Sequence, residues 1–97
     1  MHARVVSMEM LPMDMAEAAR IYRDVVIPSA KEGLGFSGAL LLTDQDTGEA
    51  VSISFWASED DMHTSEFSGF YHKKLTELDK LFISAPVRKH YELSVQE

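Results

Sequence analysis

The chain contains no cysteine and few basic residues. Without cysteine it has no disulfide framework and no thiolate chemistry. Nine Lys and Arg residues against sixteen Asp and Glu residues give a formal net charge of −7, which opposes binding to nucleic acid or to an anionic membrane. The basic residues also form no run longer than two, as in Lys73-Lys74 and Arg88-Lys89. We therefore expect neither nucleic acid nor a membrane as a partner.

Long hydrophobic segments are absent as well. The longest unbroken apolar run is four residues, Ala39 to Leu42, which is far too short to span a bilayer. The first ten residues lack the long apolar core of a signal peptide, so we expect a cytoplasmic protein. A length of 97 residues, 45% of them hydrophobic, predicts a single globular domain over residues 1–97.

Three of the five glycines have the spacing G-x-G-x-x-G, at Gly33, Gly35 and Gly38. In a dinucleotide-binding loop this motif follows a strand and opens a helix, so that the helix N-terminus meets the pyrophosphate. Here the glycines follow a helical pattern and lead into a strand pattern. We interpret them as a helix end and a turn, and we expect no nucleotide cofactor.

Alternating and helical hydrophobic patterns follow one another without a linker. Asp14 is the expected cap of the first helix, Pro28 is expected to kink or break that helix, and Ser58 is the expected cap of the second. The predicted strands cover residues 3–10, 38–43, 50–56 and 87–95, with helices between the first and second and between the third and fourth. The order βαββαβ predicts an α+β, ferredoxin-like fold with a four-stranded antiparallel sheet and both helices on one face.

The second and third predicted strands carry apolar residues on the face that two helices cannot cover. Leu40 and Leu42 alternate with Ala39 and Leu41, and in the third strand Val51, Ile53 and Phe55 share one face. A face of this kind exposes more apolar surface than monomers tolerate. We therefore expect a homodimer in which the two sheets pack against each other.

Four short motifs resemble those of the antibiotic biosynthesis monooxygenase-like proteins, and together they extend over nearly the whole chain. They are Gly35-Phe36-Ser37-Gly38, the hairpin Asp44 to Gly48, the segment Trp56 to Asp61 and the closing segment Pro86 to Leu93. The resemblance implies a dimeric α+β barrel. Some proteins of this family are cofactor-independent oxygenases of phenols or quinols, some degrade haem, and many have no known activity.

Trp56 is the only tryptophan, and it shares a strand face with Ser52 and Ser54. Two small hydroxyl residues beside a large ring leave space, and an aromatic wall with a few polar groups suits a planar ligand. We predict a ligand pocket between sheet and helices, with Trp56 and Ser52 as candidate catalytic residues. Its other predicted lining residues are Ser54, Met8, Phe67, Phe70 and Tyr71.

The resemblance implies a catalytic set that this chain matches only in part. In the phenol-oxidising relatives the tryptophan works with an asparagine four residues earlier and with a tyrosine and an arginine further along. Ser52 occupies the asparagine position here, and Tyr71 and Arg88 lie at other spacings. The resemblance thus implies a cofactor-independent monooxygenase acting on a small aromatic substrate. The alternatives are a non-catalytic small-ligand-binding protein and a structural barrel in which Trp56 fills the core.

No cofactor or metal is expected. Glu59, His63 and Glu66 share one face of the second predicted helix, but one histidine among the acids of a first helical turn is more typical of a solvated cap than of a metal site. The haem-degrading relatives combine an asparagine on the first strand with a histidine that ligates haem. The first strand here offers Ser7, and the chain contains no asparagine.

The homodimer is a testable expectation. Sedimentation at micromolar concentration should give a species of about twice the chain mass of 10.9 kDa, because the apolar sheet face needs a partner. A stable monomer under these conditions would show that the face is covered in another way.

Overall fold

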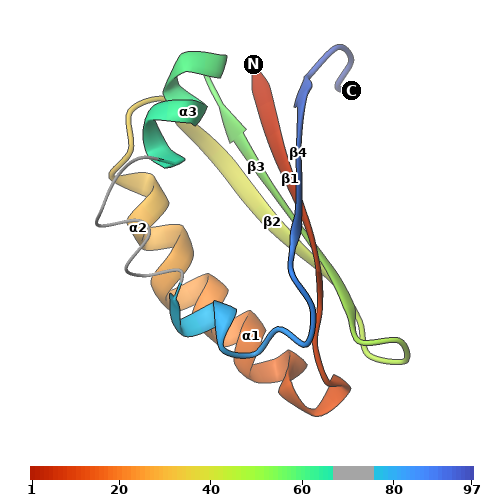
Figure 1. Ribbon diagram of the computed structural model, residues 1–97. Helices are drawn as coiled ribbons and strands as arrows, with labels where there is room; N and C mark the ends of the chain where they lie inside the picture. The colour runs from red at the N-terminus through yellow and green to blue at the C-terminus, as the bar shows by residue number, and fades with distance from the viewer. Residues whose placement is uncertain (67–75) are drawn as a thin grey trace.

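A computed structural model describes residues 1–66 and 76–97, and places the helices of this region on one side of an antiparallel sheet (Figure 1). The four strands have the spatial order β2-β3-β1-β4. Their bounds are β1 His2–Glu9, β2 Phe36–Asp44, β3 Glu49–Trp56 and β4 Val87–Glu92. The predicted α+β, ferredoxin-like fold is confirmed. None of the helices in the described part of the chain is long and apolar enough to cross a membrane.

Six strand ends differ from the sequence prediction, and the largest shift is three residues, at the end of β4. Met10 falls outside β1 but forms an isolated antiparallel bridge with Phe82. Strand β4 ends at Glu92 rather than at Val95, because its partner β1 begins at His2, which pairs with Glu92. After the Leu93 N–H donates to the carbonyl of Met1, no strand is left for the chain to pair with.

The first helical segment is continuous but irregular. A short 3₁₀ turn, η1 (Pro12–Asp14), leads into α1 (Met15–Ile21), a π-helical turn η2 (Tyr22–Val26) and α2 (Ile27–Lys31). Asp14 precedes α1, but its side chain makes no capping hydrogen bond, which corrects the predicted cap. Pro28 neither breaks nor ends the helix. Instead, the hydrogen-bond register changes in the turn before it.

The second predicted helix begins as expected. The Asp61 N–H donates to the Ser58 hydroxyl at 3.1 Å, so Ser58 caps α3 (Glu59–Glu66). A further helical turn covers residues 76–79. The predicted apolar stripe between these two segments, which includes Phe67, Phe70 and Tyr71, lies outside the described residues.

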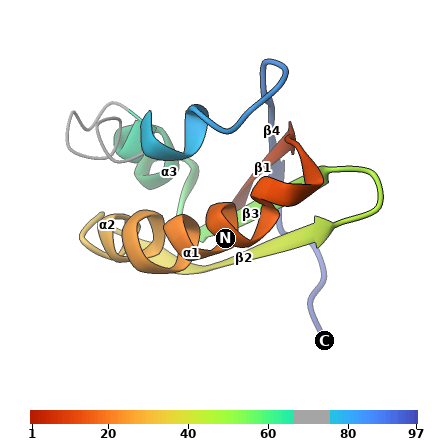
Figure 2. The same cartoon turned by 90° about the horizontal axis from the view of Figure 1, so that it is seen from below.

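The inner face of the sheet and the long helical segment form the main core. Met8, Met10, Met15, Tyr22 and Leu78 are all buried there. Val6, Met8 and Met10 alternate along the chain and all pack in this core. Viewed from below, the long helical segment lies along β2, with α3 and the 76–79 turn beside it (Figure 2).

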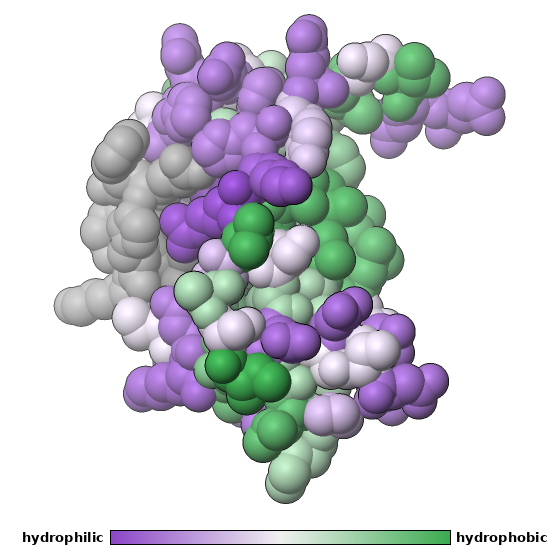
Figure 3. Space-filling model, turned by 45° about the vertical axis from the view of Figure 1, so that its right-hand side comes forward, coloured by the Kyte–Doolittle hydropathy of each residue, from purple (hydrophilic) through white to green (hydrophobic). Residues whose placement is uncertain are grey.

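The opposite face of the sheet is covered by no described element, and we call it the outer apolar face. Strand register places its residues side by side, since Leu40 lies opposite Ile53 and Leu42 opposite Val51. Leu42, Val87 and Tyr91 keep 56%, 54% and 51% of their surface exposed. Hydrophobic residues also gather along one flank of the space-filling view (Figure 3). The outer apolar face consists of Val5, Leu40, Leu42, Val51, Ile53, Phe55, Val87 and Tyr91.

The β2–β3 hairpin depends on Gly48, which has a φ of +81°. Its carbonyl accepts a hydrogen bond from the Met10 N–H at 2.9 Å, so the hairpin lies directly against the end of β1. A Cβ atom at this position would overlap the carbonyl oxygen of Met10. Only glycine combines this backbone conformation with so close an approach.

Gly48→Ala should therefore lower the free energy of unfolding by about 2 kcal/mol or more, through both the unfavourable φ and the overlap. Gln45→Ala in the same exposed turn is the control, and it should stay within about 0.5 kcal/mol of the wild type. Urea denaturation of the three proteins provides the comparison. Equal stability of the two variants would contradict the assigned role of Gly48.

Candidate functional site

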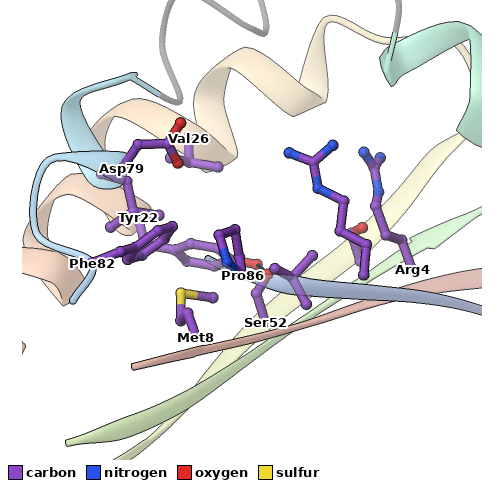
Figure 4. Close-up of a pocket in the computed structure, with 12 residues that line it drawn as sticks. Arg4, Met8, Tyr22, Val26, Ser52, Asp79, Phe82 and Pro86 are labelled. Carbon is purple, nitrogen blue, oxygen red and sulfur yellow. Dashed lines mark hydrogen bonds between the residues drawn. The ribbon is translucent and has the colours of Figure 1, made fainter. Parts of the chain in front are cut away.

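A cavity of about 40 Å³ lies between the inner face of the sheet and the helical layer (Figure 4). Strands β1, β3 and β4 supply its floor, η2 supplies one wall, and residues 78–86 supply another. The residues that line it are Arg4, Val6, Met8, Tyr22, Val26, Ser52, Ser54, Leu78, Asp79, Phe82, Pro86 and Arg88.

The two ends of the cavity differ in character. Figure 4 shows Met8, Phe82, Tyr22 and Pro86 gathered at one end and the Arg4 guanidinium at the other. The first end is therefore mostly apolar, although it also holds the Asp79 carboxylate, whereas the second carries a permanent positive charge. An arrangement of this kind suits a ligand with an apolar ring and a polar or negatively charged group.

Ser52 lies on the floor of the cavity and is hydrogen-bonded to the first helical segment. The hydroxyl oxygens of Tyr22 and Ser52 are 2.8 Å apart, and the Tyr22 hydroxyl is also 3.2 Å from the carbonyl oxygen of Leu40. Ser52 pairs with Val6 in β1 and with Leu41 in β2, so it sits in the middle of the sheet. Pairing with a strand on each side holds the backbone of Ser52 in place and so limits where its hydroxyl can lie.

Ser54 connects the cavity to Trp56. The indole N–H of Trp56 donates to the Ser54 hydroxyl at 3.1 Å. Because that bond uses a lone pair of the Ser54 oxygen, the Ser54 proton remains available to another acceptor. Trp56 thus acts on the cavity through Ser54 rather than directly.

Arg4 links the sheet to α3. Its Nη2 donates to the Ser65 hydroxyl at 2.8 Å, and its guanidinium carbon lies 5.4 Å from the centroid of the Trp56 ring. The side chain is almost completely buried, at 4% exposure. A charged group at this depth needs hydrogen bonds and aromatic contact to offset the loss of water.

The structure divides the predicted site residues into three groups. Ser52, Ser54 and Met8 line the cavity. Trp56 is fully buried and lies outside the lining, in a small cluster with Ala30, Met62 and Phe36. Its ring meets Phe36 edge-on with centroids 5.4 Å apart, and Gly33 leaves room for its far edge. Phe67, Phe70 and Tyr71 lie outside the described residues.

Nine of the twelve lining residues had no place in the sequence prediction of the site, among them Arg4, Tyr22 and Arg88. Arg4 is two residues from Val6 and therefore lies on the same inward face of β1. A charged residue on an otherwise apolar strand face could have indicated from the sequence that Arg4 belongs to the site. Tyr22 was not among the predicted site residues, and its hydrogen bond to Ser52 joins residues 30 apart in the chain. Arg88 reaches the cavity because β4 pairs with β1, a topology that no local motif specifies.

A second, more open hollow of about 350 Å³ lies near the other end of β1 and β3, next to residues 84–87. Glu9 and Glu49 are directly opposite each other there, and the Ser84 hydroxyl is 3.5 Å from Glu9 Oε2. Two facing carboxylates repel an anionic group, and no basic residue lines this hollow. It is therefore a poorer candidate site than the smaller cavity.

Two of the four arginines line the cavity, and the other two form ion pairs on the helix surface. Arg20 Nε donates to Glu17 Oε2 at 3.0 Å, and this hydrogen bond lowers the pKa of the Glu17 carboxyl. Arg23 does the same for Asp24, whose pKa is lowered by the hydrogen bond. Within residues 1–66 and 76–97, the Arg88 side chain forms no hydrogen bond or ion pair.

The residues considered for a metal site lie away from the cavity. His63 Nε2 is 3.4 Å from Glu59 Oε1, and the His63 ring lies 5.2 Å from that of His90. Across the described part of the chain, no group of three His, Cys, Asp or Glu residues is arranged to hold a metal ion. The Glu66 side chain is not among the described atoms.

Arg4→Met should lower the free energy of unfolding by about 1.5 kcal/mol or more, because it removes a charged hydrogen bond to Ser65 while keeping most of the apolar stem. Arg88→Met is the matched control at an exposed position, and it should cost less than about 0.5 kcal/mol. Thermal and urea denaturation provide the measurement. Equal effects of the two changes would show that Arg4 does not help to hold α3 on the sheet.

Comparison with known proteins identifies the fold. No family model and no curated protein matches the sequence. Solved structures match over almost the whole chain. The cofactor-independent oxygenase SnoaB from Streptomyces nogalater has a TM-score of 0.81 and 16% identity, covering 98% of this chain and 94% of that one.

Two further structures are described as putative antibiotic biosynthesis monooxygenases. The one from Caulobacter crescentus has a TM-score of 0.80 and 15% identity, covering 97% of this chain and 90% of that one. The one from Deinococcus radiodurans has a TM-score of 0.78 and 14% identity, covering 100% of this chain and 96% of that one. The chain therefore has the fold of the antibiotic biosynthesis monooxygenase-like proteins.

Proposed function

We propose that the protein is a cofactor-independent monooxygenase that oxidises a small phenol or quinol in the cavity between sheet and helices. One observation carries the proposal. Hydroxyl groups of Ser52 and Ser54 line one cavity together with arginine side chains and with the apolar side chains of Met8 and Phe82. The shared fold with SnoaB, described as a cofactor-independent oxygenase, supports the reaction class.

The chemistry requires a phenolate held away from water. A phenolate reacts with oxygen more readily than a phenol because its ring is richer in electrons, and a site that stabilises the anion therefore promotes the reaction. Ser52 and Ser54 can donate hydrogen bonds to the phenolate oxygen. The guanidinium groups of Arg4 and Arg88, which also line the cavity, add positive charge. The apolar end would hold the ring.

The reaction balances without a cofactor. A phenol with a free para carbon loses its hydroxyl hydrogen and its para hydrogen, and gains one oxygen atom from O₂ as the second carbonyl of a quinone. The other oxygen atom leaves as water with the two hydrogens. All four electrons that reduce O₂ come from the substrate, so the protein has only to bind, orient and stabilise it.

Trp56 has an indirect place in this proposal. Its N–H orients the Ser54 hydroxyl, whose proton can then point toward the substrate oxygen. Ser52, which the family resemblance aligns with an asparagine, contacts the cavity itself. We propose that Ser52 touches the substrate and that Trp56 positions Ser54.

We also propose that the protein functions as a homodimer through the outer apolar face. Burying this face against a second copy would remove Leu42, Val87 and Tyr91 from water, and each is more than half exposed in the single chain. The cavity lies on the opposite face of the sheet. It would therefore stay accessible in such a dimer.

Non-catalytic binding of a small aromatic molecule is the second candidate function. The fully buried Trp56, already paired with Ser54, favours it because the indole N–H cannot also contact a substrate directly. Binding without oxygen consumption would distinguish this function from the oxygenase.

The test is oxygen consumption by the purified protein with phenol, followed by assays for benzoquinone and hydrogen peroxide. We expect one O₂ consumed per quinone formed and no peroxide. Ser52→Ala should lower kcat/KM at least about tenfold, since it removes a hydrogen bond to the developing anion. Trp56→Phe should lower it less, about threefold to tenfold, because Ser54 keeps its hydroxyl but loses its orienting partner.

Ser37→Ala is the control. Ser37 is an exposed serine of β2, and its hydroxyl donates a hydrogen bond to the carbonyl of the nearby Gly35. Its kcat/KM should equal that of the wild type. Absence of oxygen consumption by the wild type, or an unchanged kcat/KM in Ser52→Ala, would refute the oxygenase proposal.

A further inference from the structure

The π-helical turn η2 is the least regular part of the described helices, and it borders the cavity. The Ile27 N–H donates to the carbonyl of Tyr22, a bond across five residues instead of four. The Tyr22 N–H is shared between the carbonyls of Ala18 and Ala19. The hydrogen-bond register therefore changes at Tyr22. Single π turns of this kind are rare and often occur at functional sites.

Pro28 explains why the turn is there. In a regular α-helix the N–H of residue 28 would bond to the carbonyl of Asp24. Proline has no N–H, and its ring crowds that carbonyl. The wider π turn immediately before Pro28 accommodates the ring, and the Ser29 hydroxyl donates to the Val25 carbonyl at 2.8 Å. The helix thus continues through α2 without a break.

The turn determines where the Tyr22 hydroxyl lies. Each α-helical residue turns the chain by about 100°, so one residue gained or lost in the turn would rotate Tyr22 relative to α2 by about that angle. With the π turn in place, Tyr22 is 5% exposed and lines the cavity. Its hydroxyl lies 2.8 Å from that of Ser52, on the other side of the core.

Counting protons shows what this pair presents to the cavity. Tyr22 has one hydroxyl proton, and among the described residues the Leu40 carbonyl and the Ser52 oxygen are acceptors within its reach. If Tyr22 donates to Leu40, Ser52 donates to Tyr22 and offers lone pairs to the cavity. If Tyr22 donates to Ser52, the Ser52 proton is available to the cavity. The pair can therefore act as acceptor or donor, which matches a hydroxyl or its anion.

From this geometry we infer that Tyr22 and Ser52 form one hydrogen-bonding unit that selects aromatic ligands carrying a free hydroxyl, and that Pro28, through the π turn, positions Tyr22 within it. This inference rests on the proposed function for the class of ligand. Tyr22 is thus a specificity-determining residue, and Pro28 is a positioning residue that acts through it.

The experiment measures binding without turnover. Isothermal titration calorimetry under nitrogen compares 4-methylphenol with its methyl ether, 4-methylanisole, whose ring is the same but whose oxygen cannot donate a proton. The wild type should bind the phenol at least about tenfold more tightly. Tyr22→Phe and Ser52→Ala should each reduce this preference to less than about threefold, with the affinity for the ether unchanged.

Pro28→Ala tests the positioning role. It restores the missing N–H and should allow a regular α-helical turn, so the preference for the phenol should fall as in Tyr22→Phe. Tyr91→Phe, on the outer apolar face, and Pro12→Ala, in η1, are the matched controls and should keep the full preference. The affinity for the ether reports in every variant whether the cavity is still intact.

The outcomes separate this inference from the proposed oxygenase. A phenol preference that depends on Tyr22, in a protein that consumes no oxygen, would support the inference and refute the oxygenase. Equal binding of phenol and ether by the wild type, or no binding of either, would overturn the inference. An unchanged preference in both Tyr22→Phe and Ser52→Ala would do the same. An unchanged preference in Pro28→Ala alone would refute the role of the π turn.

Discussion

The structure depends on one constraint, namely that the described helices cover only one face of the four-stranded sheet. Because side chains alternate along a strand, this constraint divides the residues of each strand between two environments. Met8 and Val6 meet the helical layer, whereas Leu42 and Val51 lie on the uncovered side. The cavity belongs to the first environment and the outer apolar face to the second. Binding of ligand and binding of a second chain can thus use opposite faces of the same sheet.

The inner face is unusual because polar residues interrupt its apolar pattern. Arg4, Ser52 and Ser54 all occupy inward positions where aliphatic side chains would give a denser core. Each has a hydrogen-bond partner, respectively Ser65, Tyr22 and Trp56. A hydrogen bond of this kind lowers the cost of burying a polar group, whereas an unsatisfied buried group costs about 1–3 kcal/mol. The inner face thus presents polar groups to a cavity between the sheet and the helical layer.

Strand alternation and turn residues were enough to predict the fold. The inward face of β1, the Ser58 cap and the glycine end of α2 were all predicted correctly, because each depends on a few neighbouring residues. The end of β4 was wrong because it depends on where β1 starts. A break at Pro28 was also not found, since the helix changes its hydrogen-bond register before Pro28 and continues through α2.

The site was less predictable than the fold. Ser52, Ser54 and Met8 were assigned to the inner face by alternation alone, and all three line the cavity. Trp56 was assigned to the same face, but its depth beside Gly33 and Phe36 depends on packing from α2 and the chain that follows it. Tyr22 and Arg88 reach the cavity through contacts across the sheet and the helical layer. Single-sequence patterns contain no information on such pairings.

The central claim is that the inner cavity, with Ser52 on its floor, is where a phenol binds. A crystal structure with 4-bromophenol tests this most directly, since the bromine blocks the para carbon against oxidation and can be located by its anomalous scattering. We expect the bromine at the apolar end near Met8 and Phe82, and the phenol oxygen within hydrogen-bond distance of Ser52. Bromine found only on the outer apolar face, or a cavity left empty at saturating ligand, would contradict the account.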